Sequence, residues 1–165
     1  MLSIVTLGDE LLQKSSNYVE VFDKELSDYT DKMFEAMLKF KGIGLASVQV
    51  GRLDRIFVVQ IPNDEPRVFI NPEIIETSVE EDHYEEGCLS IPGVNADVIR
   101  PYYVKIQAYN LKGRPFKLEA EDLLARVIQH ELDHLNGVLF IDHVDSELKN
   151  RLVTDYHQRK EKLAE

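Results

Sequence analysis

The 165-residue sequence has a single cysteine, Cys88, and therefore cannot form an internal disulfide bond. A lone thiol is typical of chains that work in a reducing compartment, and its chemistry needs an explanation. The sequence also lacks any apolar run near the roughly 18 residues that a membrane-spanning helix needs. Residues 1–8 show neither the basic nor the apolar stretch of a targeting signal. These absences predict a cytoplasmic protein that makes no membrane contact.

Positive charge is scarce too, because 19 Lys and Arg residues face 30 Asp and Glu residues, which gives a formal net charge of −11. A surface this acidic repels phosphate backbones, so direct DNA binding is not expected. Glycine and proline number only 8 and 6, which excludes collagen-like and low-complexity chains. With 44% apolar side chains, the length favours one globular domain over residues 1–165.

Hydrophobic spacing predicts helices at both ends of the chain and strands between them. A first helix face, with steps of three and four residues, consists of Phe22, Leu26, Tyr29, Met33 and Met37. This helix is expected to end near Gly42. Runs rich in β-branched residues predict short strands at 55–60 and 68–70, and two alternating runs at 104–109 and 116–118 predict a hairpin.

A second apolar stripe with helical spacing begins at Glu121 and continues to Gly137, a residue typical of helix ends. A last helix is expected from Asp145, a candidate N-cap, towards Lys162. This order predicts an α+β fold, in which the 121–137 helix packs against mostly antiparallel sheets and other helices lie at the two ends of the chain.

The strongest functional pattern is His130-Glu131-Leu132-Asp133-His134, within the second of these helices. Helix residues four apart share one face, about 5–6 Å apart between Cβ atoms, so His130 and His134 can direct ring nitrogens at one metal ion. Glu131 can then reach a water molecule at an open coordination position. The alternative is two partly exposed histidines and a solvated glutamate on an amphipathic helix.

Two histidines leave such a metal ion short of a third protein ligand. A metzincin-type continuation fails because Phe140 stands where a histidine is required, and Glu161 lies on a tail without a supporting pattern. Cys88 is the other candidate, since a thiolate and two imidazoles form a recognised catalytic zinc set. A small buried apolar residue is the alternative interpretation of Cys88, and His83 is a rival ligand.

The segment 42–49, Gly-Ile-Gly-Leu-Ala-Ser-Val-Gln, is not a dinucleotide-binding fingerprint, because Ser47 stands at the third glycine position. Its plainer interpretation is a helix terminator followed by an extended segment of small residues. The functional alternative is that this segment brings Gln49 to a reaction centre, where the side-chain amide could donate to a developing oxyanion. The backbone amide of Leu89, directly after Cys88, would point into the same space.

The segments 42–49, 86–90 and 130–134 resemble, in order and spacing, three motifs of the peptide deformylases. The resemblance extends from the first helix to about Asp142. It implies an α+β metal hydrolase that removes the formyl group from the N-terminal formylmethionine of nascent polypeptides and releases formate. N-formylmethionyl peptides are the implied substrates, and one divalent metal ion is the implied cofactor, with Fe²⁺ favoured and Zn²⁺ or another ion as alternatives.

The same resemblance implies roles for individual residues. The implied metal ligands are Cys88, His130 and His134. Glu131 would be the general acid and base, with Gln49 and the Leu89 amide stabilising the oxyanion. The Gly44 backbone would contact the substrate chain, and Glu86 would pair with Arg100 to brace the site. For the methionine side chain we nominate an apolar lining of Ile43, Tyr84, Leu123 and Val127, which could equally be ordinary core.

Two other functions and one further partner stay open at this point. A zinc-dependent peptidase of the H-E-x-x-H type would cut internal peptide bonds and would not need Cys88, and an inactive homologue would keep the fold alone. The locally basic segment from Lys149 to Lys162 could contact the ribosome, but a solvated helix face gives the same pattern. Ser47 departs from the alanine usual in the family, so its hydroxyl needs a partner if it is buried.

Overall fold

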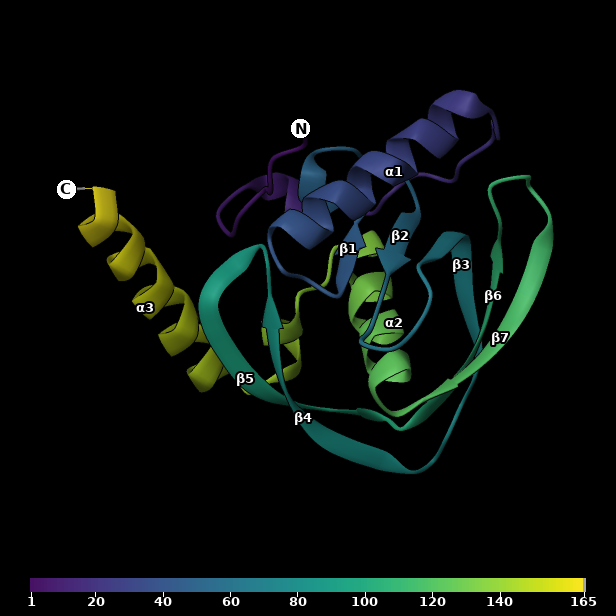
Figure 1. The fold of residues 1–165 in the computed structure, drawn as a ribbon. Helices are drawn as coiled ribbons and strands as arrows, with labels where there is room; N and C mark the ends of the chain where they lie inside the picture. The colour runs from purple at the N-terminus through teal and green to yellow at the C-terminus, as the bar shows by residue number, and fades with distance from the viewer. Residues whose placement is uncertain (165) are drawn as a thin grey trace.

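The computed structural model describes residues 1–164 and arranges three helices and seven strands around the second helix (Figure 1). In chain order the elements are α1 (Lys24–Lys39), β1 (Gly44–Ala46), β2 (Ile56–Val59), β3 (Arg67–Thr77), β4 (Glu81–Cys88), β5 (Ile91–Pro101), β6 (Tyr103–Tyr109), β7 (Pro115–Glu121), α2 (Asp122–Leu135) and α3 (Ser146–Ala164). Short 3₁₀ turns lie at Glu10–Gln13, Ser47–Val50 and Phe140–His143. The predicted α+β class is confirmed.

Every strand pair in the structure is antiparallel. One sheet has the order β1-β2-β3-β6-β7, and β4 and β5 form a separate two-stranded sheet. The predicted hairpin is confirmed as β6 and β7, with Ile106 opposite Leu118. The predicted run at 68–70 is only the first part of the longer β3, and the sequence analysis did not predict β4 or β5.

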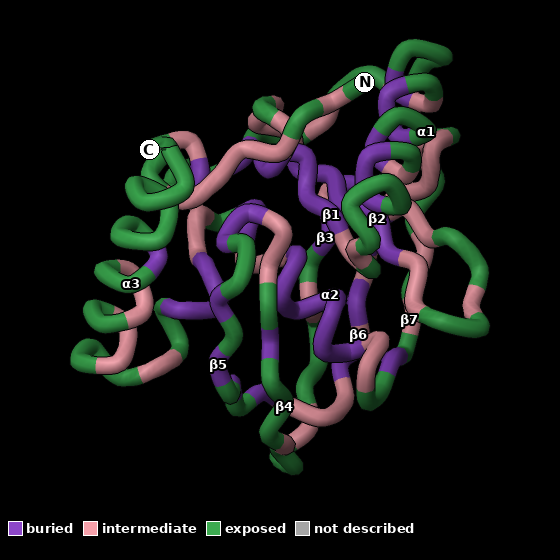
Figure 2. Tube along the Cα trace, turned by 60° about the vertical axis from the view of Figure 1, so that its left-hand side comes forward, coloured by how far each residue is buried: buried purple, intermediate pink, exposed green. Residues whose placement is uncertain are grey.

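The strand β2 lies between two helices, which explains its uninterrupted apolar sequence. Ile56 and Val58 pack with the buried face of α1, whereas Phe57 and Val59 pack with α2. A strand that is covered on both faces has a continuous apolar sequence and no alternation of apolar and polar residues. Figure 2 shows the consequence, since β1, β2 and α2 are largely buried while most of α3 is exposed.

The predicted helix boundaries match the structure closely. The side chain of Asp145 accepts a hydrogen bond of 2.8 Å from the Leu148 amide, as expected of an N-cap. Beyond the end of α2, Gly137 adopts a left-handed φ of 73°, and a Cβ atom there would lie 2.4 Å from the Gln13 carbonyl oxygen. The left-handed conformation of Gly137 ends α2, and the close Gln13 backbone leaves room for no side chain at this position. Among the described residues, no helix is both long and apolar enough to cross a membrane.

Candidate metal centre

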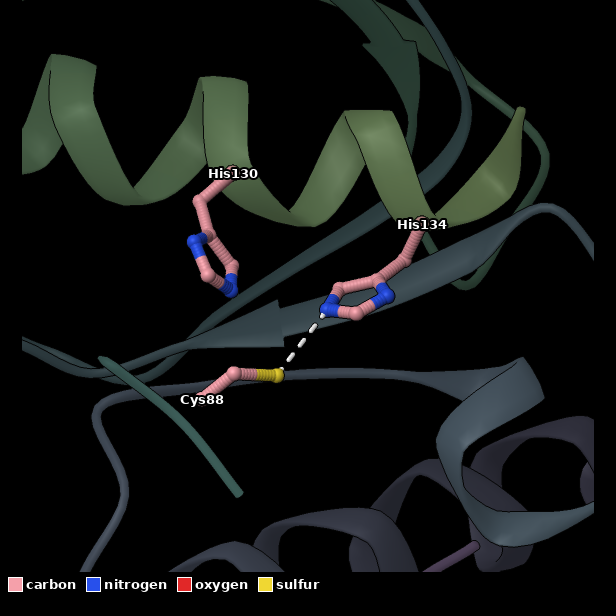
Figure 3. Close-up of side chains that lie close together, drawn as sticks. All are labelled: Cys88, His130 and His134. Carbon is pink, nitrogen blue, oxygen red and sulfur yellow. Dashed lines mark hydrogen bonds between the residues drawn. The ribbon is translucent and has the colours of Figure 1, made fainter. Parts of the chain in front are cut away.

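Two elements far apart in the sequence bring three ligand atoms together. Helix α2 projects His130 and His134 from successive turns, and Cys88 ends β4 opposite them (Figure 3). The sulfur and one ring nitrogen of each histidine all lie within 4.8 Å of one another, and Cys88 Sγ is 3.4 Å from His134 Nε2. Both imidazoles are buried. One sulfur and two nitrogen donors suit Fe²⁺, Zn²⁺ and other divalent transition metals, so the residues present fit such an ion.

The buried carboxylate of Glu86 fixes the orientation of His130. Its Oε1 atom accepts a hydrogen bond of 2.8 Å from His130 Nδ1, which leaves Nε2 free to bind a metal. Arg100 donates to both carboxylate oxygens, at 2.7 and 3.1 Å. Burial opposes the charged form of Glu86, but the hydrogen bonds from His130 and Arg100 hold its pKa well below the usual range. The expected pair of Glu86 and Arg100 is therefore present and charged.

The neighbouring titratable groups respond to burial in different directions. Burial raises the pKa of Glu131 to about 7, which suits an acid–base group that works near neutral pH. Burial lowers the pKa of His134 well below its usual range, which keeps the ring neutral and able to bind a metal. Burial also disfavours charge on His130, but Cys88, Glu86 and Glu131 raise its pKa overall. These neighbouring groups therefore favour a positive charge at the position of the His130 ring.

The side-chain amide of Gln49 is fixed at both ends. Its Oε1 atom accepts a hydrogen bond of 2.9 Å from the Ala46 amide, and its Nε2 atom donates to Ser90 Oγ at 3.1 Å and towards Cys88 Sγ at 3.5 Å. The amide N–H group therefore faces the ligand cluster, as an oxyanion donor requires.

The neighbouring Ser47 hydroxyl is fully buried and forms a hydrogen bond of 2.8 Å with the Tyr29 hydroxyl. The hydroxyl of this serine, which replaces the alanine usual in the family, therefore has the partner that its burial requires.

A cavity of about 910 Å³ opens onto this cluster. Most of the residues singled out in the sequence line it, namely Ile43, Gly44, Gln49, Tyr84, Glu86, Cys88, Leu89, Leu123, Val127, His130 and Glu131. Ile43 and Tyr84 are partly exposed, at 36% and 47%, and lie at the rim. His134 and Arg100 do not line the cavity and lie deeper in the structure, at 1% and 4% exposure.

Sequence reasoning missed two buried or partly buried charged residues on α2. Arg126 donates a hydrogen bond of 2.8 Å to Glu86 Oε2, and Asp133 accepts one of 2.9 Å from Arg100. The spacing of Arg126, one helical turn before His130, places both on one face of α2 and could have pointed to it. The rival ligand His83 is exposed, and among residues 1–164 the only group that could hold a metal ion is the one formed by Cys88 and the two histidines.

The α+β fold and the Cys–His–His group beside a buried glutamate define a metal-dependent hydrolase of the H-E-x-x-H type. A model of the polypeptide deformylase family matches residues 1–150. A peptide deformylase of Borreliella burgdorferi is 47% identical over 156 residues, which cover 94% of each chain. The chain belongs to the polypeptide deformylase family.

Solved structures agree with this assignment over nearly the whole chain. The crystal structure of a peptide deformylase from Legionella pneumophila has a TM-score of 0.93 at 37% identity and covers 99% of this chain and 98% of its own. A peptide deformylase from Synechococcus elongatus, crystallised in complex with actinonin, has a TM-score of 0.89 at 42% identity, with 94% and 86% covered. The predicted family, fold class and enzyme class are therefore confirmed.

Replacing Gly44 by alanine is expected to remove most of the deformylase activity without unfolding the chain. A Cβ atom at this position would lie 2.6 Å from Glu131 Oε2 and 2.8 Å from Val127 Cγ1, so the glutamate must move. A displacement of about 1 Å at a reacting group can cost on the order of 10²-fold in rate. The measurement is kcat/KM for a formylated peptide, with circular dichroism and metal content on the same sample. Wild-type turnover in this variant would contradict the close approach.

Proposed function

We propose that Cys88, His130 and His134 hold one divalent metal ion in this chain, and that Glu131 transfers the protons of the reaction. The reaction is the hydrolysis of the formyl group from the N-terminal formylmethionine of nascent polypeptides. The observation that carries the proposal is the convergence of three ligand atoms within 4.8 Å, beside a glutamate that is only 4% exposed. When bound, the ion supplies a Lewis acid that lowers the pKa of a water molecule towards neutrality.

Glu131 is placed to carry out both proton transfers. One of its carboxylate oxygens, Oε1, is buried and has no hydrogen-bond partner within residues 1–164, so no protein donor competes with water for this carboxylate oxygen. The water oxygen then bonds to the formyl carbon, the carbon–nitrogen bond breaks, and Glu131 returns the proton to the leaving amine. The products are formate and a peptide with a free α-amino group.

Gln49 and the Leu89 backbone amide would stabilise the charge that develops on the formyl oxygen. The Gln49 amide is already held by Ala46 and Ser90, so only the N–H group now directed at Cys88 Sγ has to turn to the formyl oxygen when the charge appears. The substrate chain would run along Gly44, the first residue of β1. This strand lies at the edge of its sheet and leaves one side free for a peptide.

The side chain of the first methionine would enter the apolar part of the cavity. Its lining would be Ile43, Tyr84, Leu123 and Val127, which all border the same space as the ligand cluster. The formyl group carries no side chain, so the cavity can be narrow at the reacting carbon and still accept the flexible thioether chain beside it.

The proposed metal is Fe²⁺, with Zn²⁺ or another divalent ion as alternatives. The resemblance to the family favours iron, and a thiolate with two imidazoles excludes none of these ions. The test is formate release from a formyl-Met peptide by protein purified without oxygen, with the metal content of the same sample. We expect turnover with one metal ion per chain. A metal-loaded but inert protein would instead point to an inactive homologue.

A zinc-dependent peptidase, the other enzyme that the sequence left open, is not favoured. The deformylase family model covers residues 1–150, and Cys88, which such a peptidase would not need, lies within the ligand cluster.

We further propose that residues 1–165 act as one catalytic domain in the cytoplasm, where formylated nascent chains are made.

Glu131→Ala should keep the metal ion and lose most of the turnover, because it removes proton transfer but no ligand. A positioned acid or base contributes about 10²–10⁴-fold to a rate, and we expect a fall in kcat of that order. The check is formate release together with metal analysis. Glu147→Ala, at an exposed position of α3, is the matched control and should behave as the wild type. An active Glu131→Ala enzyme would rule out this role.

Cys88→Ala should lose both the metal ion and the activity. The substitution leaves two imidazoles, and metal affinity depends on the full ligand set and on the deprotonated thiolate. Equilibrium dialysis against a divalent metal, followed by elemental analysis, measures the loss. A variant that still binds one equivalent tightly would show that the third ligand is elsewhere.

A contact between α3 and the ribosome stays a prediction. Only Tyr156 is fully buried on this helix, and its cations Arg151, Lys160 and Lys162 are exposed. Because removal of 149–165 would uncover the core around Tyr156, charge reversal is the sharper experiment. The contact predicts that Arg151→Glu and Lys160→Glu together weaken co-sedimentation with ribosomes. Unchanged co-sedimentation would leave α3 as a solvated face.

A further inference from the structure

The guanidinium group of Arg126 is the most completely bonded polar group around the cavity. The side chain is 5% exposed and lies one turn before His130 on α2. Its Nη1 atom donates to Glu86 Oε2 and to the Val98 carbonyl, both at 2.8 Å. Its Nη2 atom donates to the Asp82 carbonyl at 2.9 Å and to the Asp82 carboxylate at 2.8 Å. Two carboxylates thus balance its charge, and four of its donors are used.

The fifth donor of Arg126, the Nε–H group, has no acceptor within the described part of the chain. It is also not one of the fully buried polar atoms without a partner, so some of its surface remains accessible. Arg126 borders the 910 Å³ cavity together with Leu123 and Val127, the residues nominated for the methionine pocket. The ring of Tyr84 lies 5.6 Å from the guanidinium carbon. Arg126 therefore has one unused donor and borders the same cavity as the apolar side chains of Leu123 and Val127.

We propose that Arg126 is a specificity-determining residue, whose Nε–H group donates to the thioether sulfur of the first methionine. The inference rests on the proposed function, because it requires the methionine side chain to enter this cavity. A thioether sulfur is a weak acceptor, and it is the only acceptor that a methionine side chain offers. The other four bonds of the guanidinium fix its plane, so the donor is pre-organised before the substrate binds.

This arrangement distinguishes methionine from an isosteric hydrocarbon. Norleucine has nearly the same shape but carries a methylene group where methionine has sulfur. With norleucine bound, the Nε–H group would lose water and gain no acceptor, and an unpaired donor disfavours the complex. A purely apolar pocket discriminates poorly between side chains of the same shape, whereas a pocket that hydrogen-bonds its ligand rejects the analogue that lacks the acceptor.

The test compares kcat/KM for formyl-Met-Ala-Ser and formyl-norleucyl-Ala-Ser on one sample of metal-loaded enzyme. The ratio of the two values does not depend on the fraction of active enzyme, so incomplete metal loading leaves it unchanged. We expect the wild type to prefer methionine by about three- to tenfold, the range of one weak hydrogen bond. A wild-type ratio near one would overturn the inference, and failure to deformylate either peptide would overturn the proposed function itself.

Arg126→Met removes the donor and should bring the ratio close to one. If this variant does not fold, Arg126→Lys, which keeps a charge beside Glu86 but has no Nε–H group, takes its place with the same expectation. Leu123→Ala alters the pocket without touching the donor, so it should lower kcat/KM for both peptides and keep the ratio. Arg67→Met, at a surface arginine paired with Asp64, should leave activity and ratio unchanged. A folded Arg126 variant that keeps the wild-type ratio would refute the inference.

Discussion

The geometry of the candidate active site depends on one buried carboxylate. Glu86 is 4% exposed and is held by Arg100, Arg126 and His130, so it ties β4 to β5 and to α2. An unpaired charge at this depth would strongly destabilise the folded chain. Removing one partner of a buried ion pair lowers the free energy of unfolding by about 3–5 kcal/mol. The three partners must therefore meet at Glu86 whenever the chain is folded, and the orientation of the His130 ring follows from that requirement.

The same constraint sets the position of α2 between the two sheets. Its apolar stripe packs on β2, while its opposite stripe presents His130 and His134 to the end of β4. The helix approaches β1 so closely that only glycine fits at position 44. The position of Glu131 thus depends on the absence of a side chain at Gly44 as much as on the contacts that are present.

The parts of the structure that the sequence predicted are those with a local pattern. The apolar face of α1, the β6–β7 hairpin, the Asp145 cap and the two histidines of α2 each appear within a few residues of sequence. Strand β5 alternates the buried residues Val94, Ala96 and Val98 with exposed ones, a pattern that the sequence analysis did not use. Strand β4 has no such pattern, because its one buried residue is Glu86, which pairs with Arg100 of β5, and a rule that equates charge with exposure assigns both residues to the surface. Their burial is compensated by partners 14 to 44 residues away, which no local window contains.

Arg126 escaped sequence analysis for the same reason, and its bond to Glu86 connects the two proposed functions of the site, catalysis and specificity. Glu86 Oε1 accepts from His130, and Glu86 Oε2 accepts from Arg100 and Arg126. One carboxylate therefore orients His130 with one oxygen and Arg126, at the cavity wall, with the other. A substitution that moves Glu86 must disturb both functions together. The Arg126 bond and the His130 bond use different oxygens of Glu86, so a change on the cavity side of Arg126 can leave the His130 ring in place.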